Sequence, residues 1–171
     1  GTIAPQMVVG DQTIEGQQDN NAAGVAEAFQ YTAVASGTVS TLSFYQDISS
    51  SAATIQVGLY SNAAGDNAGT LLTSATFVNP VRGAWNTLAV PPASVTAGTK
   101  YWLAILGPAG GGTPVFRDVF SGGKAQASAQ TNLGALPATW TAGSTYSNAP
   151  MSAYAMAVPG GGGPTLTPTA A

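Results

Sequence analysis

Seven carboxyl groups are the clearest candidates for acid–base chemistry in this chain, which contains neither histidine nor cysteine. They belong to Asp11, Glu15, Asp19, Glu27, Asp47, Asp66 and Asp118. Glycosidases use two carboxyl groups that face each other across a cleft. Because seven acids permit many pairs, the presence of a pair does not identify a cleft. We therefore predict no catalytic residue.

The missing residue types exclude several other kinds of site. Without histidine or cysteine, the chain can form no Ser-His-Asp triad, imidazole metal site or thiolate zinc site. A serine nucleophile would need Lys100 or Lys124 as its base, and neither lies in a recognisable motif. The glycines at 110–112 lack the following Lys-Ser/Thr of a phosphate-binding loop. We expect a protein that is not an enzyme.

Only four residues are basic, namely Arg82, Lys100, Arg117 and Lys124. This number is too small for the positive surface that nucleic-acid binding requires. A buried carboxylate needs a charged partner, and arginine binds a carboxylate with two parallel hydrogen bonds. We expect Glu27 to be such a carboxylate and Arg117 to be its partner.

Asparagine- and aspartate-rich loops are the candidates for metal binding. Asp66 and Asn67, with nearby loop carbonyls, offer the oxygen ligands that Ca²⁺ prefers, and a second set is Asp19, Asn20 and Asn21. Neither stretch has the regularly spaced acids of a dedicated calcium loop, and such residues also form turns by bonding their own backbone. We predict no cofactor, with structural Ca²⁺ as the open alternative.

Aromatic side chains are the candidates for sugar binding, because an exposed ring stacks on the C–H face of a pyranose. The candidates are Tyr45, Tyr60, Trp140 and Tyr146. Strand alternation places Tyr45 and Tyr60 opposite the apolar residues of their segments, which favours exposed rings. The competing interpretation is that Trp85 and Trp140 are anchors in the core or under a loop.

Short apolar segments between turn signals indicate the elements that must position these residues. Strands are expected at residues 28–34, 38–46, 54–60, 70–77, 85–90, 100–106, 113–117 and 151–158. Residues 100–106 are apolar on both faces, so this strand should be central. One helical turn fits residues 20–27, residues 61–69 read as a loop, and residues 121–147 read as a packed loop. The prediction is an all-β, two-sheet antiparallel sandwich of jelly-roll type with eight or nine strands.

Composition separates the body of the chain from its end. Residues 1–158 form the expected sandwich domain, and residues 159–171 are a Gly/Pro/Thr-rich linker or extended tail. The opening residues lack an initiator methionine and a basic signal region, so we expect a mature or excised segment. Charged residues are 6% of the chain, against about 25% in ordinary soluble domains. We predict an extracellular or cell-surface location without membrane insertion.

Five motifs carry a resemblance to a known class of module. They are AEAF at residues 26–29, VGLYSNAAGDNAGTLL at 57–72, GAWN at 83–86, VTAGTKYWLA at 95–104 and FRD at 116–118. In this order they resemble uncharacterised β-sandwich modules of large secreted or surface-anchored bacterial proteins. The resemblance covers residues 8–157 and implies an architecture like that of carbohydrate-binding modules, with no catalytic residue.

Two functions follow as expectations. The first is a non-catalytic structural or adhesion module of a surface assembly or filament, which contacts itself or other surface proteins. Its extended termini, residues 2–9 or 165–171, would add a strand to a neighbour's sheet. The alternative is a carbohydrate-binding module of a secreted multidomain enzyme, with a polysaccharide as its partner.

Overall fold

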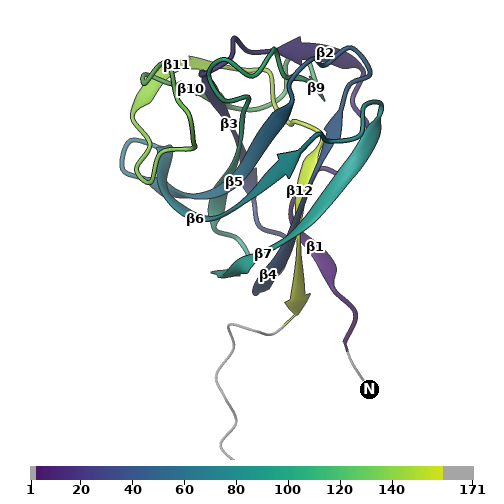
Figure 1. Cartoon of the computed structure of the whole chain (residues 1–171). Coiled ribbons are helices and arrows are strands. Elements are labelled where there is room, and N and C mark those ends of the chain that lie inside the picture. The colour runs from purple at the N-terminus through teal and green to yellow at the C-terminus, as the bar shows by residue number, and fades with distance from the viewer. Residues whose placement is uncertain (1–2, 160–171) are drawn as a thin grey trace, which may run out of the picture.

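The computed structural model describes residues 3–159, which form a sandwich of two six-stranded antiparallel sheets with no helix in this range (Figure 1). The all-β sandwich predicted from the sequence is confirmed. No helix long and apolar enough to cross a membrane occurs in the described part of the chain. The strands are β1 (Gln6–Gly10), β2 (Gln17–Asn20), β3 (Ala26–Thr32), β4 (Gly37–Gln46), β5 (Thr54–Ala63), β6 (Asn67–Val78), β7 (Ala84–Val95), β8 (Lys100–Leu106), β9 (Val115–Asp118), β10 (Ala125–Ser128), β11 (Ala142–Tyr146) and β12 (Ala153–Pro159).

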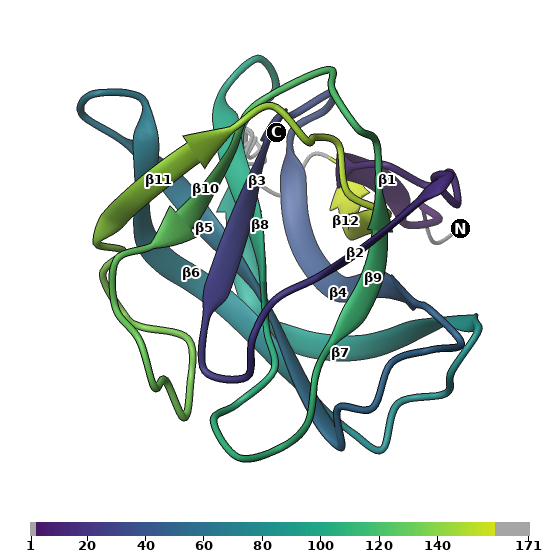
Figure 2. The same ribbon diagram turned by 90° about the horizontal axis from the view of Figure 1, so that it is seen from above.

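The first sheet has the order β1-β12-β4-β9-β2, and β7 also pairs with β4. The second sheet has the order β11-β10-β3-β8-β5-β6. Strand β8 lies between β3 and β5, and every residue from Tyr101 to Leu106 is buried, as its two apolar faces predicted. Figure 2 looks down on the end of the sandwich that has β10 and β11 on one side and β2 and β9 on the other.

The main core fills the space between the two sheets. Phe29 of the second sheet meets Phe116 of the first edge-to-face, with ring centroids 5.8 Å apart. Phe77 and Phe44 make the same kind of contact at 4.9 Å. Aromatic pairs of this geometry contribute about 0.5–1.5 kcal/mol beyond their buried area. These contacts fix the two sheets, and therefore the loops at their ends, relative to each other.

A second apolar cluster covers the outer face of the second sheet. Trp102, Tyr60 and Ala104 point away from the main core, and Leu136 and Trp140 of the β10–β11 connection close over them. The sheet is therefore buried on both faces at this point. This explains why β5 and β8 carry large side chains on both sides.

Twelve strands are present, so the expected count of eight or nine was too low. Strands β1, β2, β10 and β11 were missed because they are only four or five residues long and carry no apolar alternation apart from Val8 and Val9. Residues 121–147 are packed, as expected, but they contain β10 and β11. The expected helical turn at 20–27 was wrong, because β2 runs to Asn20 and β3 begins at Ala26.

Two strands continue through residues that were expected to end them. Strand β7 includes Pro91 and Pro92, which have no backbone N–H to donate. The register of β7 against β4 shifts between Val39 and Thr41, so the two prolines lie at an irregularity where no ladder hydrogen bond from them is required. The expected loop at 61–69 is much shorter, since β5 continues to Ala63 and β6 begins at Asn67.

The N-terminal segment completes this chain's own first sheet. Strand β1 pairs antiparallel with β12, and Val8 and Val9 are fully buried in the main core. Donation of residues 2–9 to a neighbouring molecule, which the sequence left open, therefore does not fit the structure. Residues 160–171, with the other expected donor segment, lie outside the described residues.

Candidate functional site

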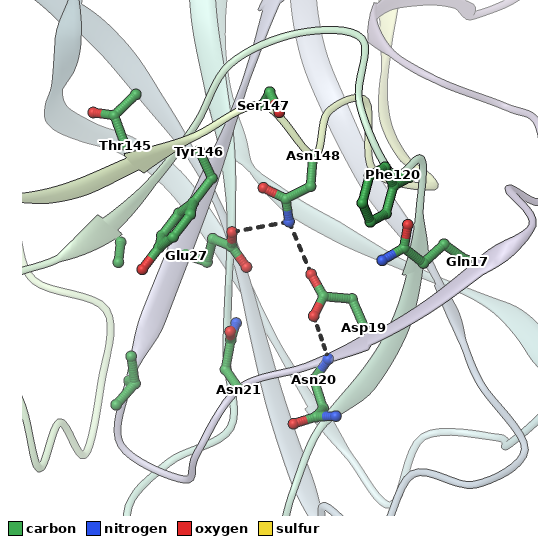
Figure 3. Close-up of a pocket in the computed structure, with 12 residues that line it drawn as sticks. Gln17, Asp19, Asn20, Asn21, Glu27, Phe120, Thr145, Tyr146, Ser147 and Asn148 are labelled. Carbon is green, nitrogen blue, oxygen red and sulfur yellow. Dashed lines mark hydrogen bonds between the residues drawn. The ribbon is translucent and has the colours of Figure 1, made fainter.

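An open pocket of about 830 Å³ lies at one end of the sandwich, where β2, the start of β3 and the loops after β9 and β11 meet (Figure 3). Most of its lining residues have polar side chains. The twelve lining residues are Gln17, Asp19, Asn20, Asn21, Val25, Glu27, Phe120, Ala127, Thr145, Tyr146, Ser147 and Asn148.

The topology explains why these residues meet here. Strand β2 is paired with β9, so Asp19 lies opposite Phe116 and Gln17 opposite Asp118. Glu27 enters from the second sheet, where it lies opposite Ala127 of β10. The chain then leaves β11 at Tyr146 and turns back over the end of the sandwich to Asn148. The pocket thus combines both sheets.

Three carboxyl groups surround the side-chain nitrogen of Asn148. This Nδ2 atom lies 2.9 Å from Asp19 Oδ2, 3.0 Å from Asp118 Oδ2 and 3.3 Å from Glu27 Oε2. A side-chain amide has only two hydrogens on its nitrogen. It can therefore satisfy two of the three carboxyl oxygens at one time.

Burial and mutual repulsion keep protons on this cluster. Desolvation, followed by the charge of Asp19, raises the pKa of Glu27 to about 7. The pKa of Asp118 is also raised well above its ordinary value, first by burial and then by its hydrogen bond to Asp19. No lysine or arginine is among the residues that line the pocket. Carboxyl groups with raised pKa values are typical of functional sites.

Two exposed aromatic rings border the same pocket. Phe120, in the loop after β9, is 82% exposed, and Tyr146, at the end of β11, is 52% exposed. Figure 3 shows them on opposite sides of Asn148, with the ring of Tyr146 beside Glu27. Two large rings left in solvent at the rim of a polar pocket are well placed to contact a ligand.

Residues 11–157 match a family described as a domain of unknown function (DUF4082). The chain belongs to this family. The match covers most of the stretch that carried the resemblance noted in the sequence, and the family's description assigns no activity. A search of curated proteins finds no match.

Two of the four aromatic candidates in this DUF4082 domain are buried and do not line the pocket. The ring of Tyr60 packs edge-to-face on Trp140 at 5.2 Å, and its hydroxyl donates to the carbonyl of Pro137 at 2.7 Å. The expected exposure of Tyr60 was wrong because the β10–β11 connection covers that face. For Trp140 the competing interpretation, an anchor under a loop, is the one that the structure shows.

The other two aromatic candidates are accessible in different places. Tyr146 borders the pocket. Tyr45 is partly buried on the first sheet, where its ring meets Trp85 at 5.8 Å and the Arg117 guanidinium at 5.7 Å. The structure therefore brings only Tyr146 to the site.

Asp66 and Asn67, the first metal candidates, already have protein partners. The Asp66 carboxylate accepts from Gln30 at 2.8 Å and pairs with Lys124 at 3.2 Å and Lys100 at 3.5 Å. The Gln30 hydrogen bond, more than Lys124, lowers the pKa of Asp66 to about 2. Asn67 Oδ1 accepts from Gln126 at 2.8 Å. These donors satisfy the oxygens that a metal would need, so this pair does not fit a cation site.

The expected pairing of Glu27 with Arg117 was also wrong. Arg117 Nε donates instead to Asp47 Oδ1 at 2.6 Å. Strand alternation is the reason, because Phe116 and Asp118 of β9 point inward and Arg117 points outward. Asp47 is fully buried, and Gln18 also donates to it at 3.0 Å.

Asn148 and Phe120 were not predicted as site residues, and Asp118 was named only as one of seven acids and as the last residue of the FRD motif. The sequence feature that did indicate this pocket was the second candidate set for metal binding, Asp19, Asn20 and Asn21. All three line the pocket.

Proposed function

We propose that this domain is a non-catalytic sugar-binding module of an extracellular or cell-surface protein, and that its ligand occupies the end pocket. The observation that carries the proposal is the pair of exposed rings, Phe120 and Tyr146, at the rim of a pocket lined by amide and carboxyl groups. This favours the second of the two functions expected from the sequence. It also agrees with the module architecture that the resemblance implied.

The chemistry of the lining matches a neutral sugar. Aromatic rings stack on the apolar C–H face of a pyranose, and hydroxyl groups bond to amides and carboxylates around the ring edge. Gln17, Asn20, Asn21 and Thr145 supply such groups without a positive charge. The charge of Asp19 disfavours an acidic sugar by like-charge repulsion.

The shape of the site indicates a short ligand or a chain end. Trp102 and Trp140 are buried, so they provide no flat row of exposed tryptophans on which a crystalline polysaccharide surface would lie. The two exposed rings instead border a hollow. We therefore expect soluble oligosaccharides to bind, and insoluble fibres to bind weakly.

The test is calorimetric titration of the domain with a panel of neutral oligosaccharides. Phe120→Ala and Tyr146→Ala should each weaken binding by about tenfold, the loss of one ring–sugar contact. Val34→Ala is the matched control, because Val34 is 68% exposed and follows the far end of β3. Equal affinities of all three variants and the wild type would contradict the proposal, as would no binding by the wild type.

A second candidate function is a self-association module, as first expected from the sequence. A groove of about 240 Å³ is lined by Val78, Val81 and Leu88, which are exposed apolar residues of β6, β7 and their connection. With 6% charged residues, little repulsion would keep two copies apart. In this second candidate function, the groove is the surface that contacts a second copy of the chain.

Sedimentation velocity at high protein concentration tests self-association. Val81→Glu should abolish a dimer, whereas Val34→Glu should not, since the two valines are 64% and 68% exposed. A wild type that stays monomeric at every concentration would contradict this second candidate.

A further inference from the structure

The edge strands of the two sheets differ in how their free backbone groups are protected. Strands β1, β2 and β7 are edges of the first sheet, and β6 and β11 are the edges of the second. An unprotected edge exposes unpaired N–H and C=O groups, which pair readily with a strand of another chain. Natural proteins therefore shorten their edge strands, cover them, charge them or place proline in them.

Each edge of the first sheet carries such a protection. Strand β7 contains Pro91 and Pro92, which have no N–H to offer. Strand β2 is only four residues long and carries the charged Asp19. In β1, the carbonyl of Val8 already accepts a hydrogen bond from the N–H of Val34 at 2.8 Å. These three strands are therefore poor templates for a further strand.

One edge of the second sheet is covered by the chain itself. The N–H of Leu71 in β6 donates to the carbonyl of Ala138 at 2.9 Å. The N–H of Trp140 donates to the carbonyl of Gly69, also in β6, at 2.8 Å. The connection between β10 and β11 thus occupies the free backbone groups of β6.

Strand β11 (Ala142–Tyr146) is the edge of the described sheets that lacks this kind of protection. Among residues 3–159 it pairs only with β10, and its five residues make no backbone hydrogen bond outside that pairing. All of them except Gly143 are exposed. The strand contains no proline, and no residue from 125 to 150 is charged. Its outer edge is therefore open to a partner.

We propose that β11 pairs antiparallel with β11 of a second copy of this chain, so that the second sheets of the two copies form one continuous sheet. The free backbone determines the chemistry of the partner, since another extended strand offers N–H and C=O groups at the matching spacing. The edge is complementary to itself about a two-fold axis, which favours a second copy. Because the strand is uncharged, no like charges face each other across the pair.

Ser144, the middle residue of β11, lies on the two-fold axis of this pair. Ala142 of one copy is then opposite Tyr146 of the other. With a rise of about 3.4 Å per residue, the two Tyr146 residues are about 14 Å apart along the strands. Side chains project away from the plane of a sheet, so the pairing uses the backbone edge and leaves both tyrosine rings free.

The dimer places two end pockets side by side, because Thr145 and Tyr146 of β11 line each pocket. A sugar chain or a sugar-coated surface that reaches both pockets binds more tightly without any new contact. This consequence rests on the proposed sugar-binding function, whereas the dimer itself does not. Sedimentation therefore decides the dimer whatever the sugar titrations show.

Sedimentation velocity of the full chain, from about 10 μM to about 1 mM, tests the pairing. Five residues form a small interface, so we expect a weak dimer that appears towards the high end of this range. Ser144→Lys should raise the dissociation constant about tenfold or more, because it places two ammonium groups opposite each other at the axis. An equimolar mixture of Ser144→Lys and Ser144→Glu should recover the dimer, which a folding defect could not produce.

Thr76→Lys is the matched control, because Thr76 is an exposed residue of β6 in the same sheet, and this variant should dimerise like the wild type. A wild type that stays monomeric at every concentration would overturn the proposal, as would a Lys/Glu mixture that stays monomeric. A dimer that Ser144→Lys leaves intact would overturn it too. So would a dimer that Val81→Glu abolishes, since that dimer would use the groove of the second candidate function.

Discussion

Removal of one hydroxyl group, in Tyr31→Phe, tests how the fold holds the pocket together. Tyr31 lies on β3 in the second sheet, and its hydroxyl donates to the carbonyl of Met151 at 2.6 Å. The same hydroxyl accepts from the N–H of Met151 at 3.0 Å. Burial raises the pKa of Tyr31 well above its ordinary value, so the group stays protonated and keeps both bonds. Met151 in turn forms a bridge with Asp118 and lies three residues after Asn148.

The expected cost follows from these two bonds. Phenylalanine keeps the ring in place, so the packing of the core is unchanged. The Met151 carbonyl retains the bond from the N–H of Ala153 at 2.8 Å, whereas the N–H of Met151 loses its acceptor. One lost hydrogen bond and one unsatisfied buried donor together cost about 2–3 kcal/mol. For a chain of this size that lowers the unfolding midpoint by about 5–10 °C.

Differential scanning calorimetry measures this change directly. Tyr45→Phe is the control, because the contacts of Tyr45 in the structure are made by its ring, with Trp85 and Arg117. It should unfold within about 2 °C of the wild type. If Tyr31→Phe were as stable as Tyr45→Phe, the Tyr31 hydroxyl would not hold the Met151 segment beside Asp118 in place.

Three further substitutions test separate parts of the structure. Burial alone would raise the pKa of Asp47, but hydrogen bonds from Ser49 and Arg117 hold this pKa far below its ordinary value. Asp47→Asn should therefore lower the free energy of unfolding by about 2 kcal/mol at neutral pH. In urea denaturation, the difference between variant and wild type should shrink below about pH 4, where the wild type loses the contribution of the ionised carboxylate. A difference independent of pH would contradict this. Trp140→Ala should lower the free energy of unfolding by about 3 kcal/mol in chemical denaturation and leave oligosaccharide affinity unchanged. A loss of affinity would indicate that the sugar binds near Trp140 and not in the end pocket. Gly10→Ala should cost about 2 kcal/mol or more, because Gly10 has a φ of 121° and its added Cβ meets the backbone of β12; wild-type stability would refute that strain.

Local alternation predicted the strands that bury an apolar face and failed for four short strands, β1, β2, β10 and β11. Residues 54–60 and 100–106 were identified because apolar residues spaced two apart, or a short apolar run between turns, are typical of a buried strand. Strands β10 and β11 consist of small and polar residues, so their pairing depends on neighbours distant in the sequence. The same reason explains the wrong prediction for Tyr60. Alternation correctly placed Tyr60 on the face opposite the main core, but it could not show that Leu136 and Trp140 cover that face.

The pocket was only partly predictable because its parts are far apart in the chain. Asp19 and Glu27 were recognisable as acids, but nothing local relates them to Asp118 or to Asn148, which lies 121 residues beyond Glu27. The β2–β9 pairing and the return of the chain after β11 bring them together. Asparagine is also common in turns, so Asn148 had no distinguishing signal in the sequence.

Backbone amide NMR during titration with neutral oligosaccharides shows directly whether the pocket end of the sandwich is the part that binds. We expect chemical-shift changes confined to residues 17–27, 118–121 and 145–148, which surround the pocket. Shifts centred instead on the groove at residues 77–88, or no shifts with any sugar of the panel, would contradict it.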